Sequence, residues 1–241
     1  LSDLCAMLVS MGADISGVGS HMIVIEGVES LQGCRHRVIP DRIETATYVL
    51  AAAITKGNVT IRDGRTDHLG AFLNVMSECG VLVESDRSEN LSVEVSDFGL
   101  KSFEAITLPY PGFPTDLQAQ TCALACQADG LSILTERVYL SRFMHVPELL
   151  RMGAEISLEG ASSIIRGGRP LTGAPVMASD LRASAALILA GLAAEGDTWV
   201  QRIYHLDRGY DAFEKKLQGL GADVERLPES EMPKAFLSQP G

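Results

Sequence analysis

Tyr110-Pro-Gly-Phe-Pro-Thr-Asp116 runs directly into a segment rich in small residues, Leu117 to Ala128. The two prolines fix φ and prevent a helix before Thr115, so we predict that a helix starts at Thr115 or Asp116. A helix start favours an ionised carboxylate, because unpaired N–H groups and the positive end of the helix dipole lie there. Asp116 is therefore a candidate general base. The alternative is a plain helix cap, which is the commoner role of Asp at this position.

Two other segments repeat this arrangement of a charged start and a small-residue helix. Asp41-Arg-Ile-Glu-Thr-Ala leads into Ala51-Ala-Ala, and Asp180-Leu-Arg-Ala-Ser leads into Ala185-Ala. Small side chains allow helices to pack closely and leave little polar surface, so we predict that these three segments form central, buried helices. Each is followed by a glycine that is predicted to end the helix: Gly57, Gly130 and Gly196.

A second pattern occurs four times and consists of an amphipathic segment, a glycine and a short apolar run. The glycines recur at intervals of about 70 residues, which indicates an internal repeat. Each should adopt the left-handed conformation that ends a helix and that a Cβ atom disfavours: Gly12, Gly80, Gly153 and Gly221. The combined patterns predict a unit of strand, buried helix, strand, amphipathic helix and hairpin.

These units define an α/β fold and a domain organisation. Residues 37–228 hold three complete βαβαββ units, predicted to form one lobe around a pseudo-threefold axis, with helices inside and sheets outside. Residues 1–36 offer one helix and one strand pair around Met22-Ile-Val-Ile-Glu26, and are expected to be the terminal piece of a second, mostly missing lobe. Residues 229–241 are expected to be an extended or disordered tail.

The composition is that of a globular protein, with 241 residues, 46% hydrophobic and 21% charged. A net charge of −11 argues against nucleic acid and anionic membranes as partners. The longest apolar run, Ala183 to Ala194, is too short to cross about 30 Å of hydrocarbon, and no signal peptide is recognised, so a cytoplasmic location is expected. Five cysteines without CxxC spacing indicate no disulfide framework, and no pattern for a metal or cofactor is present.

Arginines accompany the predicted helix starts. Arg42 and Arg182 follow Asp41 and Asp180, and Arg208 stands in a predicted turn, Asp207-Arg-Gly-Tyr210. Helix N-termini and guanidinium groups together suit a carboxylate or a phosphate. A charged aspartate beside anion-binding arginines suggests group transfer on a phosphorylated or carboxylated substrate. The alternative is an ion-pair lattice with a purely structural role.

Several long motifs resemble those of the UDP-N-acetylglucosamine enolpyruvyl transferases. They occur in the same order and extend over about residues 1–227: Val38-Ile-Pro-Asp-Arg-Ile-Glu-Thr45, Pro109 to Gln120, Arg142-Phe-Met-His-Val-Pro-Glu-Leu149, Asp180-Leu-Arg-Ala-Ser184 and His205-Leu-Asp-Arg-Gly-Tyr210. The family has two lobes of three βαβαββ units. The resemblance therefore implies that this chain is the C-terminal part of such an enzyme.

The resemblance also implies a reaction and roles for individual residues. The family transfers the enolpyruvyl group of phosphoenolpyruvate to the 3-hydroxyl of UDP-N-acetylglucosamine, at the first committed step of peptidoglycan synthesis, without metal or cofactor. Asp116 matches the base, and Arg208 matches an arginine that binds phosphoenolpyruvate. Three further matches are an apolar contact to the sugar nucleotide and residues of the cleft wall: Val138, Asp180 with Arg182, and Arg142.

The family's N-terminal Lys-Asn pair and its loop with a reactive Cys or Asp have no counterpart, so the 241-residue chain alone is expected to be inactive. Two alternatives remain open. One is the shikimate-pathway enolpyruvyl transferase, which shares the lobe architecture. The other is a non-catalytic half-enzyme that binds a sugar nucleotide. His145 and His205 lie inside matched motifs but are expected to have structural roles.

Overall fold

The structure is a computed structural model that describes residues 1–86, 90–228 and 231. The chain folds into two compact units, Leu1–Asp41 and Arg42–Gly241. The predicted tail, 229–241, lies outside the described residues except for Glu231. Among the helices described, none has the length and apolar character needed to cross a membrane.

The first unit is small and contains α1 (Ser2–Ser10), β1 (Asp14–Ser16) and β2 (Val24–Glu26). The two strands pair antiparallel, which confirms the predicted helix and strand pair. An ion pair of 3.0 Å between His36 Nε2 and the Asp3 carboxylate ties the extended segment back to α1. Cys5 is the one buried side chain in residues 1–41, so this unit has almost no core of its own.

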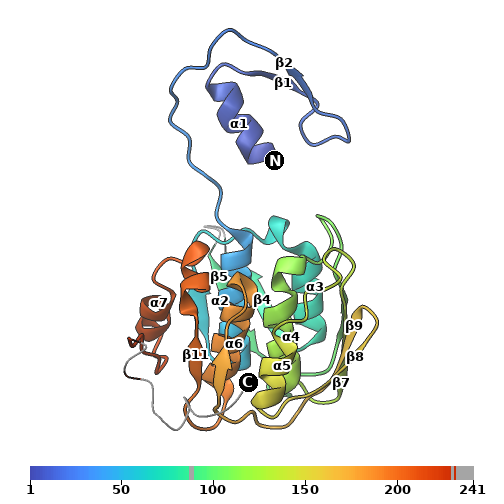
Figure 1. Ribbon diagram of the computed structural model, residues 1–241. Helices are drawn as coiled ribbons and strands as arrows, with labels where there is room; N and C mark the ends of the chain where they lie inside the picture. Colours follow the sequence, from blue (N-terminus) through green and yellow to red (C-terminus); the bar gives the residue numbers. More distant parts are fainter. Residues whose placement is uncertain (87–89, 229–230, 232–241) are drawn as a thin grey trace. The chain divides into compact units, whose positions relative to one another are not determined.

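The second unit contains three repeats (Figure 1). The first repeat consists of α2 (Arg42–Ile54), β3 (Val59–Ile61), η1 (Thr66–His68), α3 (Gly70–Glu78), β4 (Val81–Ser85) and β5 (Leu91–Val95). The second consists of β6 (Glu104–Ile106), η2 (Thr115–Leu117), α4 (Gln118–Gln127), β7 (Leu131–Thr135), α5 (Val146–Arg151), β8 (Glu155–Glu159) and β9 (Ser162–Arg166). The third consists of β10 (Pro175–Met177), α6 (Leu181–Ala193), β11 (Trp199–Gln201), η3 (Ile203–Arg208) and α7 (Phe213–Gly219).

Helices α2, α4 and α6 contact one another in the interior, and the sheets lie outside them (Figure 1). Small side chains make this possible, since Ala46, Ala123 and Ala186 are completely buried in the three helices. The outer sheets have the orders β3-β5-β4, β6-β7-β9-β8 and β10-β11. The predicted inside-out α/β architecture is therefore confirmed.

Two of the three repeats have fewer strands than the sequence predicted. The second repeat has the whole βαβαββ order, whereas residues 27–41 form no strand before α2, and residues 222–228 form no strand after α7. A strand needs hydrogen bonds from a neighbouring strand, and nothing in the described part of the chain pairs with residues 222–228. The backbone carbonyl of Val224 instead accepts a 2.6 Å hydrogen bond from the Gln218 side chain.

The repeat glycines take the conformation that the sequence predicted. Gly80, Gly153 and Gly221 have φ values of +87°, +86° and +95° after their helices. The end of α2 differs, because Lys56 at φ +53° is the left-handed residue and Gly57 is not. The left-handed turn can thus fall one residue before the glycine.

We expect Gly153→Ala and Gly70→Ala to change stability with opposite signs. Gly153 has φ +86°, so Ala should destabilise the protein by about 1 kcal/mol through backbone strain. Gly70 starts α3 without a positive φ, and a Cβ atom there meets nothing within 4 Å, so Ala should stabilise by about 0.4–1 kcal/mol. Urea unfolding of both variants measures the difference, and equal effects would contradict the assigned helix ends.

Candidate functional site

The carboxylate of Asp116 is held by two arginines from different parts of the fold. Asp116 lies in η2, directly before α4, which agrees with the predicted helix start. Its Oδ1 accepts a 2.6 Å hydrogen bond from Arg142 Nη1, and its Oδ2 accepts one of 3.2 Å from Arg182 Nη2. Within the described residues the carboxylate accepts no backbone N–H at the helix start. The cap interpretation of Asp116 is therefore wrong.

The electrostatics of this cluster favour charged groups on both sides. Partial burial raises the pKa of Asp116, but the hydrogen bond from Arg142 and the charge of Arg182 outweigh it and lower the pKa overall. Burial lowers the pKa of Arg182, while Tyr210 and Asp116 raise it above its ordinary value. Because the folded pKa of Asp116 is depressed, the ion pairs stabilise the fold at neutral pH. That stability is lost as the pH falls through the folded pKa.

Glu136, which the sequence did not single out, fixes the loop that carries Arg142. Its completely buried carboxylate accepts hydrogen bonds from the hydroxyls of Thr107 (2.5 Å) and Thr115 (2.9 Å). It also accepts from the backbone N–H groups of Val138 (2.8 Å) and Tyr139 (2.9 Å). Four donors satisfy a buried charge that would otherwise be costly. An acidic residue directly after the apolar strand β7 was the available signal.

Thr115 connects this support to the Asp116 cluster. Its hydroxyl donates to Glu136 and accepts a 3.2 Å hydrogen bond from Arg142 Nη1, the nitrogen that also reaches Asp116. The Arg142 guanidinium lies 5.3 Å from the centre of the Tyr139 ring. Val138, in the same loop, exposes 45% of its surface and is available for an apolar contact.

Asp180 acts on the site from a distance. Its Oδ1 accepts hydrogen bonds from the backbone N–H groups of Arg182 (2.7 Å) and Ala183 (2.9 Å), so it caps α6. The cap fixes the first turn of the helix, which carries Arg182. The structure thus brings Asp116, Arg142 and Arg182 into direct contact and places Asp180 behind them.

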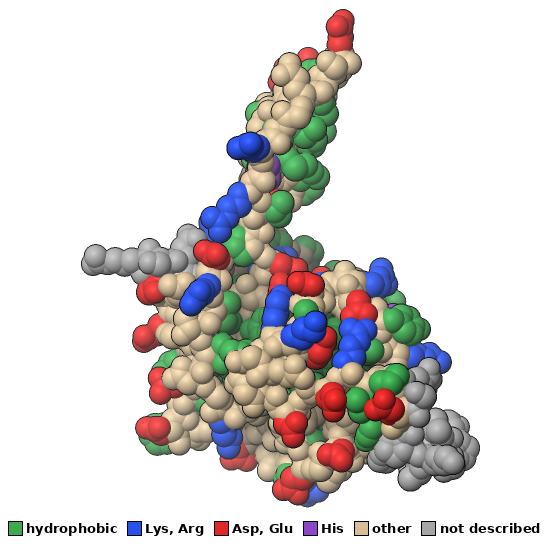
Figure 2. Space-filling view, turned by 90° about the vertical axis from the view of Figure 1, so that its left-hand side faces the viewer, with side chains coloured by type: hydrophobic (Ala, Val, Ile, Leu, Met, Phe, Trp, Pro, Cys, Tyr) green, Lys and Arg blue, Asp and Glu red, His purple; other side chains and the backbone are tan. Residues whose placement is uncertain are grey.

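Arg208 is the last residue of η3 and is exposed. The described residues give it no ion pair, whereas the neighbouring Asp207 pairs with Arg226 at 2.7 Å. The hydrogen bond from Arg226 is the main cause of the lowered pKa of Asp207. Figure 2 shows Lys and Arg side chains interleaved with Asp and Glu on one face of the protein. Arg208 is thus a cation that remains available to an external anion.

The two histidines of the motifs do not join the cluster. Burial lowers the pKa of His145 to about 4, so its imidazole is neutral at pH 7. His205 lies against the ring of Tyr204, with 4.3 Å between ring centres. A search of the described residues finds no group of three His, Cys, Asp or Glu side chains suited to a metal ion.

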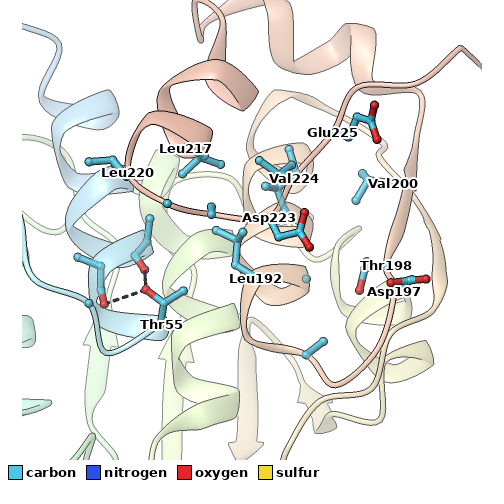
Figure 3. Close-up of a pocket in the computed structure, with 18 of the residues that line it drawn as sticks. Thr55, Leu192, Asp197, Thr198, Val200, Leu217, Leu220, Asp223, Val224 and Glu225 are labelled. Carbon is cyan, nitrogen blue, oxygen red and sulfur yellow. Dashed lines mark hydrogen bonds between the residues drawn. The ribbon is translucent and has the colours of Figure 1, made fainter.

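A pocket of about 680 Å³ lies at the opposite ends of the central helices (Figure 3). It is lined by C-terminal residues of α2 and α6, by β11 and by residues 217–227, and it contains none of the six predicted site residues. Asp197, Asp223 and Glu225 line it as well, which disfavours an anionic substrate. The Asp116 cluster is therefore the better candidate for an anion site.

Comparisons with known proteins agree with this geometry. Residues 1–217 match the family model of EPSP synthase (3-phosphoshikimate 1-carboxyvinyltransferase). The UDP-N-acetylglucosamine 1-carboxyvinyltransferase of Granulibacter bethesdensis is 54% identical over 94% of this chain and 54% of its own length. That of Oleidesulfovibrio alaskensis is 53% identical over the same shares. The chain thus spans about half the length of the curated relatives it matches.

Solved structures show the same fold. The enolpyruvyl transferase NikO from Streptomyces tendae superposes with a TM-score of 0.83 and 29% identity, over 92% of this chain and 53% of NikO. An EPSP synthase from Acinetobacter baumannii gives a TM-score of 0.70 at 20% identity, over 91% of this chain and 54% of that one, and shows the fold alone. From its match over residues 1–217, the chain belongs to the EPSP synthase family of enolpyruvyl transferases.

Proposed function

We propose that this chain is part of a cytoplasmic enzyme that transfers the enolpyruvyl group of phosphoenolpyruvate to the 3-hydroxyl of UDP-N-acetylglucosamine and releases phosphate, the first committed step of peptidoglycan synthesis. The observation that carries the proposal is the ionised carboxylate of Asp116 between Arg142 and Arg182, with Arg208 free for an anion. The names of the relatives at 53–54% identity favour the sugar nucleotide over shikimate 3-phosphate.

Asp116 is assigned the proton of the sugar hydroxyl. As that proton leaves, the hydroxyl oxygen bonds to the central carbon of the enolpyruvyl group, and the bond to phosphate breaks. Asp116 is a weak base while both arginines hold it, because their charges favour its ionised form. Its side chain is 39% exposed, so a bound anion can draw the arginines away and raise its basicity.

The other predicted residues have supporting roles in this proposal. Arg208 binds the carboxylate or phosphate of phosphoenolpyruvate with its planar fork. Val138 contacts the sugar nucleotide, while Asp180 keeps Arg182 in place through the helix cap. No metal or cofactor is required for this reaction. A half-enzyme that only binds the sugar nucleotide is the alternative, and turnover experiments on a full-length version decide between the two.

The 241-residue chain alone should release no phosphate above background with both substrates present. The half of the relatives' length that it lacks is expected to carry the Lys-Asn pair and the reactive loop. Positioning by a complete cleft contributes about 7–11 kcal/mol in favourable cases, and most of this would be lost. A colorimetric phosphate assay measures it, and substrate-dependent release by the purified chain would contradict the expectation.

In a full-length version, Arg208→Lys should raise the KM for phosphoenolpyruvate about tenfold or more with little change in unfolding. The ammonium of Lys cannot reproduce the two-point contact of the guanidinium. Arg169→Lys is the control, because Arg169 is an exposed cation that pairs with Glu155. A shifted thermal midpoint with unchanged KM would instead support a structural role for Arg208.

Asp116→Asn in the same full-length version should lower kcat by roughly 10²–10⁴-fold, since Asn keeps the shape but accepts no proton. The cost in stability should stay near 1 kcal/mol, because the ion pairs are partly exposed. Asp67→Asn is the matched control, since Asp67 forms a comparable pair with Arg65 outside the site. Near-normal turnover of Asp116→Asn would remove Asp116 from the role of base.

A further inference from the structure

The hydroxyl of Tyr210 lies at a buried junction of the three central helices. Thr47 Oγ1 of α2 is 2.9 Å from it, Gln120 Nε2 of α4 is 3.4 Å away, and Arg182 Nη1 of α6 is 3.4 Å away. Tyr210 is 2% exposed, and Thr47 and Gln120 are completely buried. One phenolic oxygen thus contacts a side chain from each of the three repeats.

The direction of the hydrogen bonds at this junction follows from its donors. Thr47 Oγ1 donates its proton to the carbonyl of Ile43 at 2.8 Å, so it accepts from the Tyr210 hydroxyl. The side-chain N–H groups of Gln120 and Arg182 are donors only, so both donate to the phenolic oxygen. The resulting chain runs from Arg182 through Tyr210 and Thr47 to the carbonyl of Ile43.

This chain fixes one end of the Arg182 guanidinium. Nη1 donates to Tyr210, which leaves Nη2 directed at Asp116 Oδ2. At 3.4 Å the bond from Nη1 is long and individually weak, but its oxygen is anchored by Thr47 and shielded from water. If the phenolic oxygen were removed, Nη1 would lose its partner, and the guanidinium could rotate away from Asp116.

We propose that Tyr210 is a positioning residue of the transferase site, holding Arg182 in the orientation that reaches Asp116. Its consequence for turnover rests on the proposed function. Tyr48 supplies an internal comparison, because both tyrosine rings pack against Phe213, with centres 5.4 and 5.0 Å away for Tyr48 and Tyr210. The Tyr48 hydroxyl is also buried but has no hydrogen-bond partner within the described part of the chain. Ring packing is common to both, whereas the contact with Arg182 belongs to Tyr210.

Tyr210→Phe and Tyr48→Phe, made in the 241-residue chain, separate positioning from packing. NMR of ¹⁵N-labelled arginine measures how fast the Arg182 guanidinium rotates. We expect Tyr210→Phe to accelerate this rotation several-fold and Tyr48→Phe to leave it unchanged. Equal rates in both variants would overturn the inference. Thr47→Val removes the acceptor that anchors Tyr210 and should also accelerate the rotation, which keeps the test decisive if Tyr210→Phe fails to fold.

Kinetics of a full-length version test the consequence for turnover. Tyr210→Phe should lower kcat about three- to tenfold, the size expected from one hydrogen bond, with the KM of both substrates within about twofold of the parent. Tyr48→Phe should retain the parent kcat. A faster guanidinium with unchanged kcat would overturn the positioning role. A parent without transferase activity would contradict the proposed function instead, and the rotation rates would still decide whether Tyr210 holds Arg182.

Discussion

The site depends on one electrostatic constraint: the carboxylate of Asp116 is held between two guanidinium groups from different repeats. Arg142 comes from the loop after β7, and Arg182 comes from the first turn of α6. Each pair is partly exposed, so neither contributes much to stability by itself. Their value is geometric, because the carboxylate, the loop and the helix start can occupy only one arrangement when both contacts form.

Three carboxylates support this arrangement in three different ways. Glu136 is buried and organises the loop that carries Arg142. Asp180 caps α6 and fixes the backbone of Arg182. Asp116 is the one of the three that faces both arginines and remains partly exposed. Environment thus decides the role of each acid, since burial with four donors makes Glu136 structural while exposure leaves Asp116 accessible to a substrate.

The sequence predicted the repeats because their signals are local. A glycine after an amphipathic helix and small residues in a buried helix each follow from neighbouring residues, as Gly80 and Ala123 illustrate. The strands of the incomplete repeats were overestimated, because an isolated apolar run such as the one around Val224 does not reveal whether a partner strand exists. Residue identity alone also could not place the left-handed turn at Lys56. The site was only partly predictable for the same reason: the contact of Asp116 with Arg142 joins residues 26 positions apart, and Thr47 is 163 residues from Tyr210. Composition and periodicity carry no information about such contacts, whereas the resemblance of whole motifs did identify Arg142.

The account rests on Asp116 being an ionised carboxylate that two arginines hold. Titration of the ¹³C-labelled side-chain carboxyl of Asp116 in the 241-residue chain, followed by NMR, tests this claim most directly. The account predicts a pKa below the ordinary value of 3.8, because the arginines outweigh the effect of burial. A pKa at or above 3.8 would show that burial dominates and that the arginines do not hold the carboxylate in solution, which would contradict the account.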